Sequence, residues 1–243
     1  MSLLTLTLLS TVTALATGLG ALPLAWRSAA SPRGIGLASA LAAALMLAAS
    51  AGLVREGLAY GAGLTAGGAV LGALFVYAAH AWAARQPDAH VWGLSGAGAR
   101  RALLIFGVMF AHSFTEGVGL GVSFAGDAAL GAFVTVTMAL HNIPEGLAIA
   151  LVLVPQGMSM RRASGWAVLS SLPQPLMAVP AYLFVERFAV LLPLGLGFAA
   201  GAMTWLALTD LLPDAVRQAS SRSVAAVVAV VGFAAALAGW LAS

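Results

Sequence analysis

Long apolar stretches run through most of this chain, and they limit its possible folds more than any other feature. Of its 243 residues, 61% are hydrophobic and only 8% are charged, and the mean hydropathy is +1.00. A soluble globular domain carries roughly a quarter charged residues. A helix that crosses a bilayer needs about 20 largely apolar residues. We therefore predict an all-α polytopic membrane protein surrounded by the lipid bilayer.

Eight apolar stretches of this kind predict eight transmembrane helices in one transmembrane domain, 1–243. Their approximate bounds are 3–26, 35–54, 60–84, 102–124, 129–154, 164–185, 190–212 and 221–242. The longest connection, 85–101, is polar and rich in glycine. Because no basic segment precedes the first stretch, we expect it to remain as a span rather than to act as a signal peptide.

The arginines predict the orientation of the chain in the membrane. Nine of them follow odd-numbered spans, and only Arg55 and Arg187 follow even-numbered ones. Cytoplasmic connections carry an excess of basic residues. We therefore expect both termini to be extracytoplasmic and 85–101 to be a cytoplasmic loop. No basic face exists outside the connections, so we expect no nucleic-acid partner. The Ala-, Gly- and Arg-rich, Lys-free composition suggests a bacterial inner membrane protein.

Two short motifs place ionisable residues inside the fourth and fifth stretches. His112 precedes Glu116, and His141 precedes Glu145, by four residues each, and a glycine follows each glutamate. This spacing stacks the two side chains on one helix face. Ionisable residues inside a membrane mark a functional site by default. The motifs recur at matching depth on antiparallel spans, as in transporters with inverted repeats and a midplane site.

Two interpretations of the paired motifs remain open from the residues alone. The four side chains can act as hydrogen-bonded contacts between helices, or they can hold a metal ion. Imidazole and carboxylate without thiolate suit Zn, Fe, Mn, Co or Ni, and the chain has no cysteine. The repetition of the motif and the proline within its second copy, Pro144, favour a metal site.

Polar residues close to the motifs are weaker candidates. Asn142 and Gln174 carry neutral amides that either bind metal weakly or make ordinary hydrogen bonds. Ser113 has a hydroxyl that commonly bonds to its own helix, and Met46 is a soft ligand or a core filler. Prolines on both sides of Gln174, with Pro180 further on, predict a helix that is broken twice beside a cavity.

Four further residues have both a functional and an ordinary interpretation. Asp210 and Asp214 can attract cations at a pathway mouth, or they can lie in the solvated headgroup zone. His80 and His90 lie near or in the cytoplasmic connection, where they can deliver metal or can simply be solvated.

With these residues in view, the chain resembles the ZIP family of divalent metal transporters, especially its bacterial GufA-like members. The most specific matches are residues 112–124 and 139–148, followed by 197–203 with Asp210-Leu-Leu-Pro-Asp214. The resemblance implies a 3+2+3 arrangement of eight helices with an inverted repeat. It also implies a binuclear metal site on the fourth and fifth helices, and a homodimer.

The resemblance also implies a set of metal ligands. One ion would be held by His112, Glu116, His141 and Glu145, with Met46 at its edge. A second ion would share the two glutamates and be completed by Ser113, Asn142 and Gln174. Members of the family with a full binuclear site typically have an acid or an amide at the first two of these positions and glutamate at the third. Charge count tunes the affinity for hard cations, so we predict one competent site and one degraded site.

The function implied by the resemblance is passage of a divalent metal into the cytoplasm, most naturally zinc, with Fe, Mn, Co and Cd also possible. A metal sensor of the same fold that does not transport is the first alternative. An intramembrane metalloenzyme is the second, but the chain lacks HExxH and the paired ExxH motif. We therefore expect a transporter rather than an enzyme. No GxxxxGK[ST] motif is present, so we expect no use of ATP.

Overall fold

Apolar stretches of this length form helices because a helix satisfies its own backbone hydrogen bonds inside lipid. The computed structural model describes residues 2–26, 31–85 and 96–241. The regular structure within these ranges is helical and contains no strand, which confirms the predicted fold class. The helices are α1 (Leu3–Leu19), α2 (Pro23–Trp26), α3 (Pro32–Tyr60), α4 (Ala62–Ala84), α5 (Gly96–Gly126), α6 (Ala128–Leu153), α7 (Met160–Ser170), α8 (Pro173–Arg187), α9 (Leu192–Leu206), α10 (Leu212–Gln218) and α11 (Ser221–Leu241).

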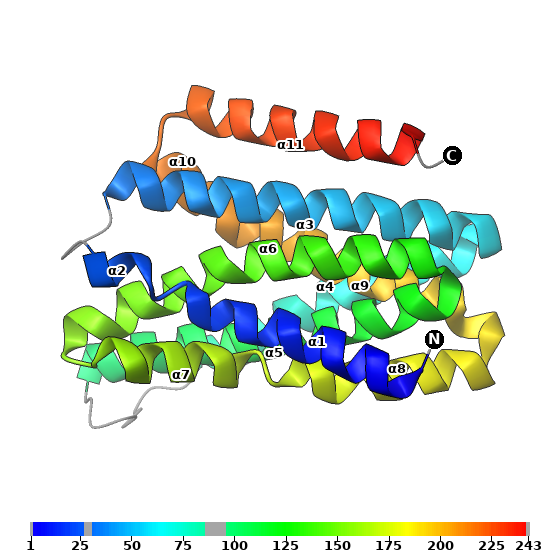
Figure 1. The fold of residues 1–243 in the computed structure, drawn as a ribbon, viewed down its shortest axis with the longest axis horizontal. Helices are drawn as coiled ribbons and strands as arrows, with labels where there is room; N and C mark the ends of the chain where they lie inside the picture. Colours follow the sequence, from blue (N-terminus) through cyan, green and yellow to red (C-terminus); the bar gives the residue numbers. More distant parts are fainter. Residues whose placement is uncertain (1, 27–30, 86–95, 242–243) are drawn as a thin grey trace.

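The long helices run roughly alongside one another and form one bundle (Figure 1). Helix α3 lies between α11 and α6, and α6 in turn lies beside α1 (Figure 1). The eight predicted spans correspond to eight rods, three of which are composite. The first consists of α1 and the short helix α2. Helices α7 and α8 make up the sixth, and the seventh consists of α9, a π-helical turn (Ala207–Leu211) and α10. Helix α1 begins, and α11 ends, at the same end of the bundle (Figure 1).

Several rods have the length and composition of membrane-crossing helices. Five segments within the described residues qualify. They are Pro32–Tyr60, Ala62–Trp82, Ala128–Gln156, Met160–Arg187 and Ala189–Gln218. Two shorter apolar helices, Leu3–Leu19 and Ser221–Leu237, lie beside them in the bundle. The chain is therefore a multi-pass membrane protein.

Two local expectations differ from the structure. The segment 85–101 is not a loop over its whole length, because α5 already begins at Gly96; a helix can extend beyond its apolar part where water or headgroups accept polar side chains. Residues 86–95, including His90, lie outside the described residues. The sixth span is broken once rather than twice, between Ser170 and Pro173. Proline in the first turn of a helix removes only an N–H that has no helical partner.

Helices α5 and α6 form a tight antiparallel hairpin. A single residue, Asp127, separates them, and its Oδ1 accepts a hydrogen bond of 2.8 Å from the backbone N–H of Leu130. Such an N-cap satisfies one of the free donors at the start of a helix. Pro144 lies inside α6 and does not end it. The hairpin therefore brings the two His/Glu motifs to the same depth in the bundle.

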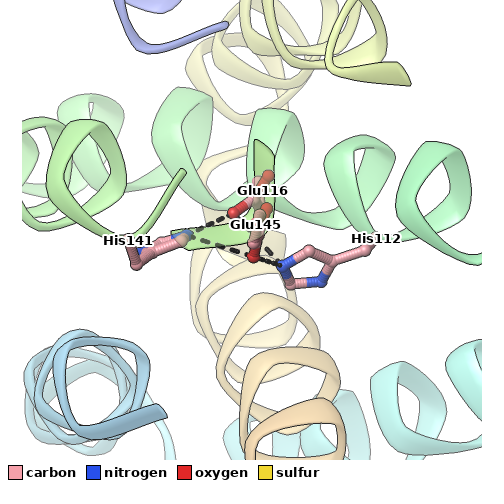
Figure 2. A group of neighbouring side chains, drawn as sticks. All are labelled: His112, Glu116, His141 and Glu145. Atoms are coloured by element: carbon pink, nitrogen blue, oxygen red, sulfur yellow. Dashed lines mark hydrogen bonds and ion pairs between the residues drawn. The ribbon is translucent and has the colours of Figure 1, made fainter. Parts of the chain in front are cut away.

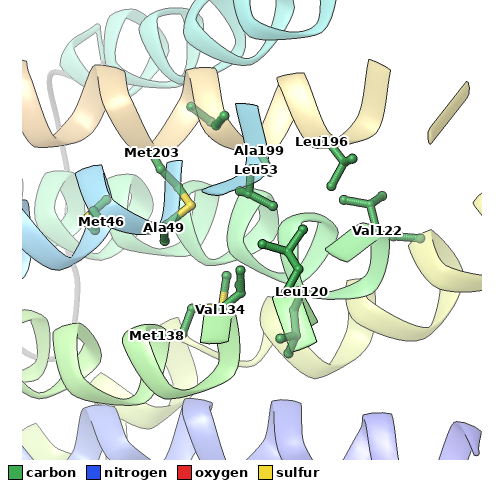
Figure 3. Packing of buried hydrophobic residues seen from close by; sticks show 14 of the residues in the cluster. Met46, Ala49, Leu53, Leu120, Val122, Val134, Met138, Leu196, Ala199 and Met203 are labelled. Atoms are coloured by element: carbon green, nitrogen blue, oxygen red, sulfur yellow. The ribbon is translucent and has the colours of Figure 1, made fainter. Parts of the chain in front are cut away.

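The main hydrophobic core lies where α3, α5, α6 and α9 meet (Figure 3). Most of its residues are aliphatic or small, and they include Met46, Ala49, Leu53, Leu120, Val122, Val134, Met138, Leu196, Ala199 and Met203. Hydrocarbon groups pack without directional bonds. The contact between α3 and α9 on one side and the α5–α6 hairpin on the other is therefore apolar.

Glycine allows the hairpin to approach its other neighbours closely. A Cβ on Gly117 would lie 2.5 Å from the backbone oxygen of Gln174 and 2.9 Å from that of Pro173. A Cβ on Gly146 would clash with the backbone oxygen of Thr17. Small residues at these two positions thus permit close helix packing. They place α8 directly against α5, and α1 directly against α6.

Candidate metal site

The two predicted His/Glu pairs meet at one place in the bundle. His112 and Glu116 lie one turn apart on α5, and His141 and Glu145 lie one turn apart on α6. All four residues are at most 3% exposed. One ligand atom from each lies within 4.8 Å of those from the other three. The structure thus brings together the four side chains that the repeated spacing predicted to converge.

The two carboxylates lie between the two imidazole rings (Figure 2). Nε2 of His112 is 3.0 Å from Oε1 of Glu145 and 3.2 Å from Oε1 of Glu116. Nε2 of His141 contacts Oε1 of Glu116 and is 4.0 Å from Oε1 of Glu145. Each imidazole therefore faces one carboxylate from its own helix and one from the neighbouring helix.

This spacing suits a small divalent cation. Ligand atoms about 2.0 Å from a tetrahedral zinc ion are roughly 3.3 Å apart. The distances from Nε2 of His112 to the two carboxylate oxygens, 3.0 and 3.2 Å, are near this value. Nδ1 of His112 and Nδ1 of His141 are buried and have no hydrogen-bond partner among the described residues. The Nε2 atoms face the carboxylates, so Nε2 is the nitrogen that each imidazole would offer to a cation bound here.

Ser113 and Met46 occupy different surroundings. Ser113 is buried next to His112 on α5, and within the described part of the chain no hydrogen bond joins it to the four-residue cluster. Met46 is fully buried on α3 and belongs to the hydrophobic core (Figure 3). Their roles as ligands remain predictions.

The amides of Asn142 and Gln174 form a buried hydrogen-bond network beside the cluster. Gln174 donates through Nε2 to Oε2 of Glu116. Its Oε1 accepts from Nδ2 of Asn142 at 3.1 Å and from the hydroxyl of Thr13 at 3.2 Å. Nδ2 of Asn142 also donates to the backbone oxygen of Thr13 at 2.7 Å. The network connects α1, α6 and α8 to Glu116 on α5.

Thr13 is the participant that sequence reasoning missed. It is separated from Gln174 by 161 residues, and nothing in its local sequence marks it as a partner. The only available signal was the row of small polar residues along α1. Two of them, Thr13 and Thr17, are buried one turn apart. The second hydroxyl lies 2.7 Å from that of Ser171, at the break between α7 and α8.

Two acidic residues near the end of the seventh rod have different partners. Oδ2 of Asp210 lies 3.4 Å from Nε2 of His80 on α4, and both side chains are partly exposed. Asp214 pairs with Arg217 at 3.0 Å on the exposed surface of α10. The Asp214 carboxylate therefore has a basic partner in its own helix, while Asp210 joins two rods.

Fold and cluster together define a multi-pass membrane protein with a buried His/Glu site of the kind that binds divalent metals. The family model described as ZIP zinc transporter matches residues 76–239. The chain belongs to the ZIP zinc transporter family, a family named for transport rather than for an enzyme activity.

Relatives with assigned names are similar over large parts of the chain. The protein named "Putative zinc transporter At3g08650" from Arabidopsis thaliana is 42% identical over 227 residues, 92% of this chain and 36% of that protein. Zinc transporter GufA of Myxococcus xanthus is 34% identical over 157 residues, 63% of this chain and 61% of GufA. Zinc transporter ZIPB of Bordetella bronchiseptica is 34% identical over 143 residues, 58% of this chain and 46% of ZIPB. The chain thus spans about a third of the first relative and three fifths of the second.

Proposed function

We propose that this protein carries a divalent metal ion, with zinc as the main substrate, through the membrane into the cytoplasm. The observation that carries the proposal is the buried cluster of His112, Glu116, His141 and Glu145 on the α5–α6 hairpin, of which α6 is long and apolar enough to cross a membrane. Burying two imidazoles and two carboxylates inside a bilayer costs free energy, and such residues are therefore a functional-site hypothesis by default. The names of the relatives support zinc, and ligand chemistry also permits Fe, Mn, Co and Cd.

The hydrogen bonds between helices support a relative movement of two groups of helices. Within the described residues, the side-chain hydrogen bonds that join different helices lie among α1 and α5–α8. The contact of this group with α3 and α9 is apolar. Apolar contacts have no fixed directional geometry. In our proposal the first group therefore carries the metal cluster and rocks or slides against the second.

Orientation, location and assembly are further parts of the proposal. The arginine distribution supports extracytoplasmic termini, and the relatives from bacteria support a bacterial inner membrane. For the homodimer, Gly63 and Gly67 support a role of α4, because both lie on its exposed face with open space beside them. Small residues four positions apart let two membrane helices approach closely.

The experiment that tests transport is metal influx into liposomes that contain the purified protein and a metal-sensitive dye. Zn, Fe, Mn, Co and Cd are compared in the wild type and in Glu145→Ala. Ser123→Ala is the matched control, since Ser123 is fully buried on α5 and its hydroxyl donates, among the described residues, only to Leu120 of its own helix. We expect saturable influx in the wild type and the control, and its loss in Glu145→Ala.

Two other outcomes assign a different function. Wild-type protein that binds metal stoichiometrically but shows no influx indicates a sensor. Metal-dependent hydrolysis of an added substrate, again without influx, indicates an intramembrane metalloenzyme. Either result contradicts the proposed transport.

A further inference from the structure

The two oxygens of the Glu116 carboxylate have different surroundings. Oε1 faces the imidazole nitrogens of His112 and His141. Oε2 accepts a hydrogen bond from the amide of Gln174. Both Glu116 and Gln174 are fully buried. One oxygen is therefore directed at the metal cluster, and the other is occupied by a neutral donor.

The orientation of the Gln174 amide is determined from both ends of the network. The backbone oxygen of Thr13 can only accept, so the side chain of Asn142 must present its Nδ2 there. The same Nδ2 donates to Oε1 of Gln174, and this leaves Nε2 of Gln174 facing Glu116. A carboxylate can only accept, so it also requires the amide N–H in this direction. Reversing either amide would place two acceptors against each other.

The charges in the cluster lead to the same conclusion. Glu116 and Glu145 supply two formal negative charges, which match one divalent cation. The groups on the other side of Glu116 are the neutral amides of Asn142 and Gln174 and the hydroxyl of Thr13. A second divalent ion at this place would be buried without compensating charge, which is strongly unfavourable.

We propose that Gln174, held by Asn142 and Thr13, is a positioning residue that occupies Oε2 of Glu116 with its amide N–H and so limits the site to one cation, bound through Oε1. This inference rests on the proposed metal site. In this proposal the hydrogen-bond network of Gln174, Asn142 and Thr13 takes the place that a second ion would occupy. Outer groups of this kind orient a ligand and raise metal affinity, and their loss typically costs 10- to 100-fold.

The first test counts ions. Zinc per chain is measured by elemental analysis on purified protein after dialysis against zinc, with calorimetry for the affinity. We expect one ion in the wild type and two in the double variant Asn142→Asp/Gln174→Glu, in which carboxylates replace both amides. Two ions in the wild type overturn the proposal. If the double variant folds but still binds one ion, the proposal is also overturned. In that case the two amides are not what excludes a second zinc ion.

The second test removes only the donor. Gln174→Met keeps the length of the side chain but cannot donate to Glu116. We expect a Kd for zinc that rises by roughly 10- to 100-fold while the stoichiometry remains one. The matched control is Gln156→Met, because Nε2 of Gln156, in the 3-10 turn after α6, donates among the described residues only to the backbone oxygen of Val152 at the end of α6. Thermal unfolding in detergent identifies variants that fail to fold. An unchanged Kd in folded Gln174→Met contradicts the positioning role.

A rescue pair separates positioning from general stability. Thr13→Val removes the hydroxyl that contacts Gln174, whereas Thr13→Ser keeps it. We expect weaker zinc binding in the first variant and wild-type binding in the second. Equal affinities in the two variants contradict a role of the hydroxyl. These measurements do not depend on transport, so the two proposals can fail separately. One bound ion without influx refutes the proposed function but not this inference. Influx with two bound ions refutes this inference but not the proposed function.

Discussion

A methyl group added at Gly117 tests how the α5–α8 contact supports the His/Glu cluster. In Gly117→Ala the new Cβ would lie 2.5 Å from the oxygen of Gln174, and 2.9 Å from both the oxygen of Pro173 and the Cβ of Met177. Real Cβ atoms essentially never approach closer than 3.0 Å, so α8 must move away by roughly 0.5 Å or more. Because two of the three neighbours are backbone carbonyls, no side-chain rotation can relieve the contact.

The expected cost follows from overpacking. Inserting a methyl group into a closely packed contact costs about 1–3 kcal/mol. Gly107→Ala on the same helix is the matched control, because a Cβ there has no atom within 4 Å. Helix propensity should favour alanine by up to about 1 kcal/mol at both positions, so this effect cancels in the comparison.

Thermal unfolding in detergent and zinc calorimetry measure the result. At about 2–4 °C per kcal/mol for a chain of this size, Gly117→Ala should unfold roughly 2–12 °C below Gly107→Ala. The outward movement of α8 also withdraws Gln174 from Glu116, so zinc affinity should fall about tenfold or more. Equal melting temperatures and equal affinities for the two variants would refute the reasoning that this contact positions the cluster.

Two further predictions concern chemistry and packing. Zinc influx into liposomes should fall as the external pH is lowered from about 7.5 to about 5.5, because imidazole and carboxylate bind metal in their deprotonated forms; a pH-independent influx would contradict binding through the His/Glu cluster. Leu120→Ala removes a fully buried side chain from the core between α5 and its neighbours. It should lower the free energy of unfolding by about 2–5 kcal/mol in the detergent unfolding assay. Leu176→Ala, at an exposed position on α8, should have a much smaller effect in the same assay.

Much of the fold could be predicted because its signals are local. Apolar stretches long enough for a bilayer predicted the rods, and the spacing of four residues predicted which face of α5 and α6 carries each His/Glu pair. The convergence of His112, Glu116, His141 and Glu145 followed from the repetition of one motif on adjacent antiparallel spans.

The features that escaped prediction depend on tertiary contacts. The hydroxyl of Thr13 meets Gln174 across 161 residues, and Asp210 meets His80 from another rod; no local pattern encodes either pairing. Proline alone did not locate the break in the sixth span, because a proline in the first turn of α8 is compatible with the helix. The roles of Ser113 and Met46 as ligands remain predictions, because geometry brings neither into a described polar contact with the cluster.

The one-residue connection between α5 and α6 has a consequence for how the four donors act together. Since Asp127 alone joins the two helices, the four side chains belong to one covalent hairpin, and in the proposed metal site they would act as a preformed multidentate chelator. The entropy of bringing them together is lost when the hairpin folds, before any ion arrives, and a short loop keeps this loss small. The hairpin is thus the smallest continuous piece of the chain that holds all four donors, and it is the natural unit for transplanting the cluster into another bundle.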